Sequence, residues 1–237
     1  MVSNDLRQKY YGDPKYDGTH MYYAWIRSYL TTTSKVLNIG AGPETNSPVR
    51  TLKGEVAEVV GIDIDPIVKE NRELDRGLVI KNGLFPLEDQ SFDIVFCDYV
   101  LEHVEHPTLF LSETRRVLKP GGRFFFRTPN LFHYVPLISM ATPDWFHKAV
   151  ANRVRMLPNE THEPWPTFYR MNTRSALQRL SEQAGFSQKE FRMIECEPSY
   201  LMFHTVPFYF GLAYERLVNS TQALAGMRVQ ILGQFQR

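Results

Sequence analysis

Two short patterns contain the residues best suited to chemistry: a glycine turn, and a carboxylate 21 residues beyond it. Residues 36–42 read Val-Leu-Asn-Ile-Gly-Ala-Gly, an apolar strand that runs into Gly40 and Gly42. Glycine lets a ligand approach the backbone closely and tolerates a positive φ. Asp63 ends the next apolar run, where an acid can accept hydrogen bonds from both hydroxyls of a ribose. The spacing favours a nucleoside-binding site, although Asp63 could instead cap a helix that starts near Asp65.

The elements that must position these residues alternate between strands and helices. Strands are expected in continuous apolar runs, which are typical of strands buried on both faces, at residues 35–39, 56–62, 78–80, 93–97 and 123–128. One helix is expected at 107–118, where Pro107 suits the first turn, and another after Thr173, a suitable N-cap that precedes a helix ending at Gly185. This order is typical of an α/β fold with a mostly parallel sheet.

Length and composition limit the class of protein. The 237 residues are 43% hydrophobic and carry a net charge of +1, which suits one large domain or one domain with an appendage. The charge balance argues against a dedicated nucleic-acid binder. Cys97 and Cys196 are too few for a disulfide scaffold, so we expect a cytoplasmic protein with reduced thiols. Neither a secretory signal nor a membrane-spanning run of about 20 apolar residues is expected.

Five patterns in order resemble the class I S-adenosylmethionine-dependent methyltransferases, in the small-molecule subgroup often called type 11. They are residues 36–42, residues 59–63, Phe-Pro-Leu-Glu-Asp-Gln-Ser-Phe-Asp at 85–93, Val-Leu-Glu-His-Val at 100–104 and Arg-Val-Leu-Lys-Pro-Gly-Gly at 116–122. The resemblance covers residues 35–130 and returns at 176–186. It implies a Rossmann-like three-layer α/β sandwich with a mostly parallel central sheet, and S-adenosyl-L-methionine as the cofactor.

The resemblance also implies which residues hold the cofactor. They are Asn38, Gly40, Ala41 and Gly42 at the amino-acid tail, Asp63 and Ile64 at the ribose, Asn82, Gly83 and Leu84 at the adenine, and Asp98 and Tyr99 near the sulfonium. Two positions depart from the family pattern, because Asn38 replaces the usual acid and Glu44 the usual third glycine. These departures leave open a non-catalytic module with a degenerate nucleotide site.

Methyl transfer from a sulfonium depends mainly on alignment, which can supply roughly 7–11 kcal/mol. A base is needed only where the acceptor loses a proton, as a hydroxyl does. The candidates are His103, which follows the fourth strand, and His133, which follows the fifth. His103 could instead bond the backbone at a helix start, and His133 could pack among aromatic rings. Related quinone O-methyltransferases hold a metal with Glu-x-x-Glu-His, but Tyr99 stands at the first glutamate position, so no metal site is expected.

The chain is predicted to divide into an N-terminal cap segment at 1–34 and a methyltransferase domain at 35–237, with a lid inserted at 129–172. The lid is rich in proline, aromatic and basic residues, a composition suited to gripping an anionic or glycosylated small molecule. We therefore predict O-methylation of a sugar- or carboxylate-containing metabolite. Residues 208–218 could pack in the core, form a dimer face or touch a membrane surface, and the last would fit a membrane-peripheral glycolipid or quinone methyltransferase.

Two other enzyme classes fit the sequence less well. A short-chain dehydrogenase needs Tyr-x-x-x-Lys after the nucleotide half, and the only such spacing, Tyr11 to Lys15, precedes the glycine turn. An amide N-methyltransferase should show Asp/Asn-Pro-Pro-aromatic after the fourth strand, where residues 97–100 read Cys-Asp-Tyr-Val. The patterns leave the acceptor atom and the oligomeric state undetermined.

Overall fold

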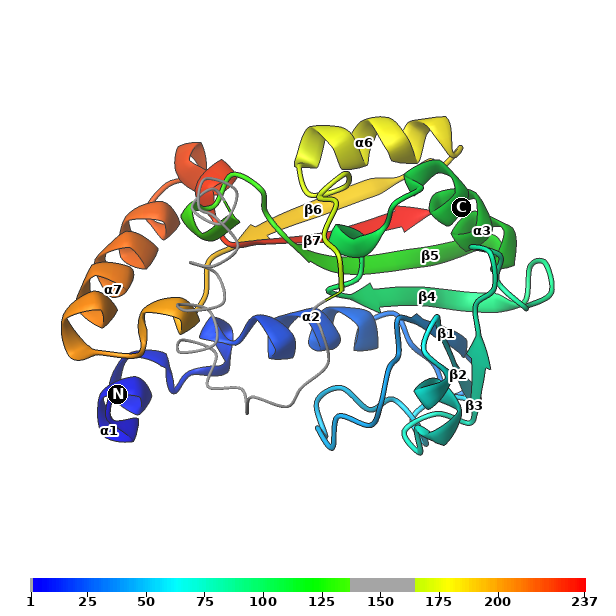
Figure 1. Cartoon of the computed structure of the whole chain (residues 1–237), viewed down its shortest axis with the longest axis horizontal. Helices are drawn as coiled ribbons and strands as arrows, with labels where there is room; N and C mark the ends of the chain where they lie inside the picture. The colour runs from blue at the N-terminus through cyan, green and yellow to red at the C-terminus, as the bar shows by residue number, and fades with distance from the viewer. Residues whose placement is uncertain (1, 137–164) are drawn as a thin grey trace. The chain divides into compact units, whose positions relative to one another are not determined.

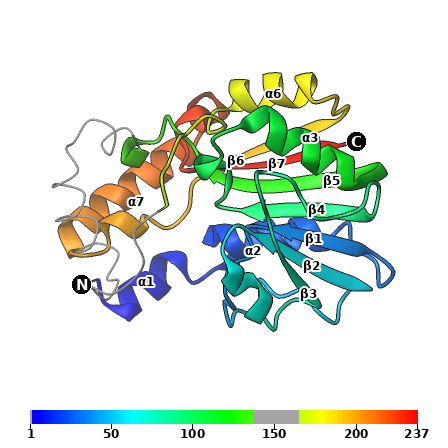
Figure 2. The same ribbon diagram turned by 45° about the vertical axis from the view of Figure 1, so that its right-hand side comes forward.

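A seven-stranded sheet in the order β3-β2-β1-β4-β5-β7-β6 forms the centre of the fold (Figures 1 and 2). The structure is a computed structural model that describes residues 2–136 and 165–237. Neighbouring strands from β3 to β5 pair in parallel, and β7 runs opposite to β4 and β6 (Figure 1). The strands are β1 (Lys35–Ile39), β2 (Glu58–Asp63), β3 (Arg76–Val79), β4 (Phe92–Asp98), β5 (Leu118–Pro129), β6 (Lys189–Ile194) and β7 (Gln230–Gln236). The expected mostly parallel sheet is confirmed.

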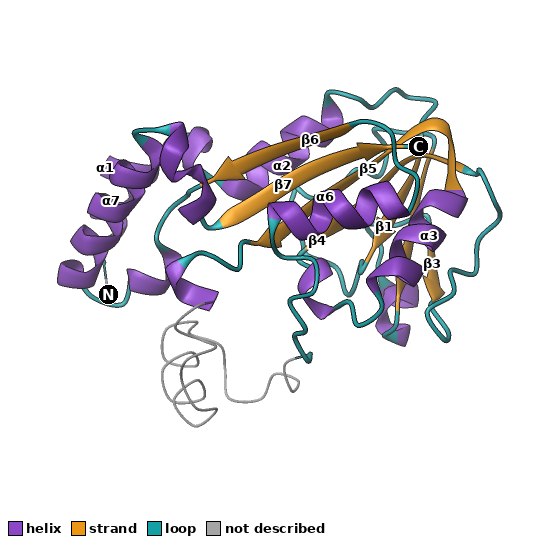
Figure 3. Ribbon diagram, turned by 90° about the horizontal axis from the view of Figure 1, so that it is seen from above, coloured by secondary structure: helices purple, strands orange, loops and turns teal. Residues whose placement is uncertain are grey.

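Helices cover both faces of this sheet (Figure 3). Phe124 and Phe125 are neighbours in β5, so their side chains point to opposite faces. Phe124 lies 6.1 Å from the Phe110 ring on one side, and Phe125 lies 5.2 Å from the Trp25 ring on the other, centroid to centroid. The expected three-layer sandwich is therefore confirmed. The helices are α2 (Gly18–Arg27) on the Phe125 side, and α3 (Pro107–Val117) and α6 (Arg174–Gln183) on the Phe124 side.

Most expected boundaries agree with the structure to within two residues, but β5 begins earlier than the apolar run suggested. Leu118 leaves α3 and pairs with Phe92, and a register shift precedes the next pair, Ile94 with Arg123. The Pro-Gly-Gly segment therefore lies inside an irregular start of β5. As expected, Thr173 caps α6, its Oγ1 accepting a hydrogen bond from the Ala176 amide.

The chain forms two compact units. One unit contains the sheet core, residues 22–128, 167–192 and 231–237. The other contains residues 2–21, 129–136, 165–166 and 193–230 of the described chain. Cys97 and Cys196 are both buried. The cap at 1–34 and the lid at 129–172 remain predictions, and residues 137–164 of that lid lie outside the described residues.

The second unit is built from α1 (Asn4–Tyr11), α7 (Thr205–Asn219) and short 3₁₀ turns. One face of α7 is buried, and its Phe208 ring packs on Tyr10 and Tyr11 at about 6 Å. The opposite face exposes Phe210 and Leu217. Segment 208–218 is thus half in the core and half at the surface. Among the described residues, no helix combines the length and apolar character needed to cross a membrane.

Candidate functional site

The glycine turn follows β1 at the edge of the sheet where the parallel strands end. Gly40 and Gly42 have φ values of +71° and +52°, a region that side-chain-bearing residues rarely adopt. A Cβ on Gly40 would lie 2.3 Å from Cγ2 of Val100, so nothing larger than glycine fits there. The amide of Gly40 donates to the carbonyl of Ile62, which fixes the turn to β2. The side chain of the buried Asn71 stabilises the turn, because its Nδ2 donates a hydrogen bond to the carbonyl of Gly42 at 3.0 Å.

Asp63 closes β2 beside this turn. Its Oδ2 accepts from the amide of Gly42, and its Oδ1 accepts from the amide of Asp65, both at 2.9 Å. The cap of the following 3₁₀ helix (Pro66–Glu70) is Asp65, whose Oδ1 accepts from the Ile67 amide. A carboxylate has about four lone-pair sites, so two backbone donors leave capacity for further donors. The position therefore fits the ribose hydroxyls that sequence reasoning assigned to Asp63.

Three apolar side chains are exposed where β2, β3 and β4 end: Ile64, Leu84 and Tyr99. Leu84 closes a tight turn after β3, in which its amide donates to the carbonyl of Lys81 at 3.0 Å. Asn82 and Gly83 form the centre of that turn, with φ values of +52° and +74°. Exposed apolar groups along one edge are suited to an aromatic base.

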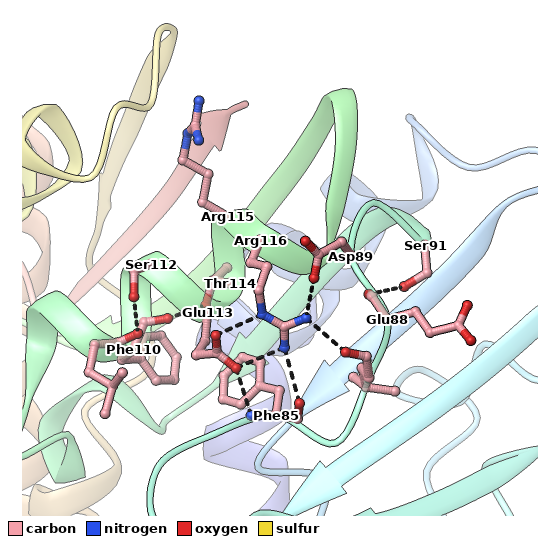
Figure 4. A network of polar contacts seen from close by, with 12 residues as sticks. Phe85, Glu88, Asp89, Ser91, Phe110, Ser112, Glu113, Thr114, Arg115 and Arg116 are labelled. Atoms are coloured by element: carbon pink, nitrogen blue, oxygen red, sulfur yellow. Dashed lines mark hydrogen bonds and ion pairs between the residues drawn. The ribbon is translucent and has the colours of Figure 1, made fainter.

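A clamp formed by Arg116 of α3 fixes the loop that follows this turn (Figure 4). Its guanidinium donates to the carbonyls of Phe85 and Leu87, and makes a two-bond contact with Glu113 at 2.7 and 2.8 Å. Glu113 in turn accepts from the Phe85 amide at 2.8 Å. Arg116 holds the pKa of Glu113 below its usual range. The Phe-Pro-Leu-Glu-Asp and Arg-Val-Leu-Lys-Pro patterns thus meet in space, and their shared role is structural.

The segment between the glycine turn and β2, residues 43–57, forms a loop rather than a helix. Arg27 of α2 stabilises it, donating to the carbonyls of Val49 and Thr51 at 2.8 Å and to both carboxylate oxygens of Glu55. A small, partly open cavity of about 30 Å³ lies between this loop and the sheet. Side chains from α2, β1 and the loop line it, among them Tyr23, Asn38 and Arg50.

Asp98, at the end of β4, has its carboxylate bonded within the protein. Nε and Nη2 of Arg127 donate to its two oxygens at 2.6 and 2.7 Å, and Nη1 of Arg50 lies 3.7 Å from Oδ2. The Arg127 guanidinium also stacks over the Tyr22 and Tyr99 rings. A ligand at this position would therefore meet the Asp98 backbone and the exposed Tyr99. The arginine inside the aromatic run Phe124–Arg127 was the sequence signal for this pair, and sequence reasoning missed it.

His103 ends a 3₁₀ turn, Leu101–His103, directly after β4, where it is half-buried. Its neighbour Glu102 is buried, and its Oε2 accepts from Oγ1 of Thr128 at 3.1 Å. Nδ2 of Asn172 donates to the same hydroxyl oxygen at 2.7 Å. Burial raises the pKa of Glu102. Sequence reasoning missed Thr128 and Asn172, which lie 44 residues apart and meet only in the fold.

His133 belongs to the other compact unit and is buried there. Its Nδ1 accepts from the Val135 amide at 3.3 Å, and its Nε2 lies 3.6 Å from Oε2 of Glu195, beyond hydrogen-bond distance. Its ring centroid lies 4.1 Å from that of Tyr134. Burial lowers the pKa of His133 to about 4 and raises that of Glu195 to about 8. Burial therefore favours the uncharged form of both groups.

Comparison with known proteins identifies the family. Residues 37–126 match the family model described as a methyltransferase domain. A ubiquinone biosynthesis O-methyltransferase of Pseudomonas putida is 30% identical over 176 residues, which cover 70% of each chain. The enzyme of the same name from Pseudomonas syringae pv. tomato is 28% identical over 75% of each chain. The chain belongs to the class I S-adenosylmethionine-dependent methyltransferases. A solved S-adenosylmethionine-dependent methyltransferase of Archaeoglobus fulgidus shares the fold, with a TM-score of 0.55 at 17% identity over 98% of each chain.

Membership of this family confirms the predicted enzyme class and its cofactor, S-adenosylmethionine. The family also favours the enzyme over the non-catalytic module that Asn38 and Glu44 left open. The edge of the sheet fits the cofactor, because a cradle that only glycine can form at residue 40 lies beside a carboxylate with spare acceptor capacity and exposed apolar groups. The structure brings to this edge the ends of β1 to β4, with the predicted residues Asn38, Gly40, Ala41, Gly42, Asp63, Ile64, Asn82, Gly83, Leu84, Asp98 and Tyr99.

Proposed function

We propose that this methyltransferase transfers the methyl group of S-adenosylmethionine to a hydroxyl oxygen of a quinone-type aromatic acceptor. The support is the name shared by the relatives at 28–30% identity, ubiquinone biosynthesis O-methyltransferase. The sugar- or carboxylate-containing acceptor that the lid composition suggested gains no such support. A quinone-type acceptor also agrees with the exposed aromatic ring of Tyr99, just after β4.

The cofactor supplies an activated methyl group, and the residues of the chain bind it and align the acceptor. In this proposal Gly40 and Gly42 allow the close backbone approach, and Asp63 accepts from the ribose hydroxyls. Leu84 lies along the base and Tyr99 near the reacting centre. Alignment is the main contribution, since in-line transfer needs no covalent intermediate with the protein.

An aromatic hydroxyl loses its proton with a pKa of about 10, so a base assists at neutral pH. Of the two predicted histidines, we assign this role to His103. It follows β4 in the unit that holds the cofactor edge, it is half-buried, and it is adjacent to the buried Glu102. His133 is less suited, since its ring is buried beside Glu195 and its pKa is about 4.

Methyl transfer to a panel of acceptors tests this function. The purified chain would be incubated with S-adenosylmethionine labelled in its methyl group and with catechols or hydroquinones that carry short prenyl chains. Sugars and aliphatic carboxylates form the comparison set, and Asp63→Ala is the cofactor-binding control. We expect O-methylated aromatic products from the wild type, and a His103→Gln variant with lower kcat and a shifted pH profile. Methylation of only the sugars or carboxylates would overturn the proposal.

A further inference from the structure

The loop at 43–57 leaves one part of the cofactor without an obvious partner. A helix that begins after a glycine turn presents free amides and a partial positive charge to an anion. Here the glycine turn leads into a loop, so no helix N-terminus faces the edge at residues 43–57. The amino-acid tail of S-adenosylmethionine ends in a carboxylate, which then requires a different cation or donor group.

Arg50, on this loop, is one of the residues that line the cavity beside the glycine turn. The cavity is lined on that side by Tyr23, Asn38, Ala41 and Arg50. The Arg50 side chain is 35% exposed, so its guanidinium is open to a ligand as well as to the protein. Within residues 2–136 and 165–237, its one ion pair is the 3.7 Å approach to Asp98.

The charge of Asp98 is already balanced without Arg50. Both of its oxygens accept hydrogen bonds from Arg127, at 2.6 and 2.7 Å. A guanidinium has five N–H donors in a planar fork that matches a carboxylate, and a single 3.7 Å contact leaves most of them available. Asn38, on β1, lines the same cavity without a charge, whereas an acid there would compete for the guanidinium. Glu73 also lines the cavity, and its carboxylate accepts from the amide and hydroxyl of Thr45.

We propose that Arg50 binds the carboxylate of the cofactor's amino-acid tail, with the Asn38 amide and the Tyr23 ring beside it. The cofactor site of this chain thus recognises an amino-acid anion through a guanidinium carried by a loop. This role would explain why position 38 carries an uncharged asparagine, because an acid there would pair with Arg50 in place of the ligand. The proposal depends on cofactor binding and is independent of the acceptor.

Calorimetric titration with two ligands tests the proposal. S-adenosylhomocysteine carries the amino-acid tail, and 5′-methylthioadenosine lacks it but keeps the nucleoside. Arg50→Gln should raise the Kd for S-adenosylhomocysteine at least tenfold and change the Kd for methylthioadenosine less than twofold. Arg50→Lys should lie between the wild type and Arg50→Gln, because an ammonium retains the charge but not the fork. Arg72→Gln, on an exposed arginine 3.7 Å from Glu44, is the matched control and should change neither Kd.

Two outcomes would overturn the proposal, and a third would refute only the proposed acceptor. An unchanged affinity of Arg50→Gln for S-adenosylhomocysteine would show that the tail is held elsewhere. Equal weakening of both ligands in Arg50→Gln and Arg50→Lys would show that the arginine supports the fold of the loop instead. Wild-type protein that binds S-adenosylhomocysteine but methylates no aromatic hydroxyl would refute the proposed acceptor and leave the role of Arg50 standing.

Discussion

The buried ion pair between Asp98 and Arg127 gives a quantitative test of how the ends of β4 and β5 are stabilised. The two hydrogen bonds of this pair are 2.6 and 2.7 Å long, and the Asp98 side chain is 7% exposed. The chain offers a matched control in Asp89, whose carboxylate lies 2.7 Å from Arg116 but is 68% exposed. The two aspartates share their chemistry and their distance from a guanidinium, and differ in burial.

The substitutions Asp98→Asn and Asp89→Asn keep the side-chain shape and remove one charge. Two unit charges 4 Å apart attract by about 4 kcal/mol at an effective dielectric constant near 20, and by about 1 kcal/mol in water. Removing one partner of a buried pair costs about 3–5 kcal/mol, because the other charge stays buried alone. Exposed pairs contribute only about 0.2–1 kcal/mol. At about 2–4 °C per kcal/mol, Asp98→Asn should lower Tm by about 6–20 °C, and Asp89→Asn by less than about 4 °C.

Thermal unfolding followed by circular dichroism, with urea titrations alongside, measures both variants. The double variant Asp98→Leu with Arg127→Met removes both charges and should recover part of the loss, since an apolar pair of similar volume needs no compensating charge. The reasoning fails if Asp98→Asn costs no more than Asp89→Asn. It also fails if the double variant is less stable than Asp98→Asn alone.

Three further substitutions test the glycine turn, the loop clamp and the buried acid. Gly40→Ala should lower the free energy of unfolding, measured in urea, more than Gly54→Ala does. Both glycines have a positive φ, which costs a residue with a side chain about 1–3 kcal/mol, but of the two only Gly40 would bring a Cβ into collision with another side chain. Equal losses would contradict this. Arg116→Met should reduce the loss of folding stability at acid pH, because Arg116 lowers the pKa of Glu113. The ionised Glu113 stabilises the fold above its unfolded pKa of about 4.3, and this contribution is lost as the pH falls through the folded pKa. If the urea midpoint falls with acid pH as steeply in the variant as in the wild type, the clamp does not act in this way. Burial raises the pKa of Glu195 to about 8, so between pH 6.5 and 8 the folded carboxyl keeps a proton that the unfolded chain has lost. The free energy of unfolding therefore declines by up to about 1.4 kcal/mol per pH unit in this range, and Glu195→Gln should flatten that decline. Below pH 6.5 the lowered pKa of His133 opposes this trend, so a slope that persists in the variant above pH 6.5 would refute the assignment.

The sequence by itself determined the fold class and placed the glycine turn and Asp63 at the ends of neighbouring strands. A continuous apolar run predicted β1 at Lys35–Ile39, as the structure has it. A strand that is covered on both faces buries successive side chains, so its sequence is a continuous apolar run. Glycines before a strand-ending acid placed Gly40 and Asp63 together, since parallel strands end at the same edge of the sheet. These signals are local, and each depends on residues close together in the chain.

Only the tertiary structure decided which charged groups of distant segments pair with one another. Arg127 pairs with Asp98, and Arg116 clamps a loop about 30 residues before it. Both arginines stood in recognisable patterns, but their partners depend on strand register and helix packing, which spacing does not specify. Arg50 had no sequence signal, because the loop at 43–57 carries no periodicity. Its place beside Asn38 follows from the sheet and from the contacts that Arg27 makes with that loop.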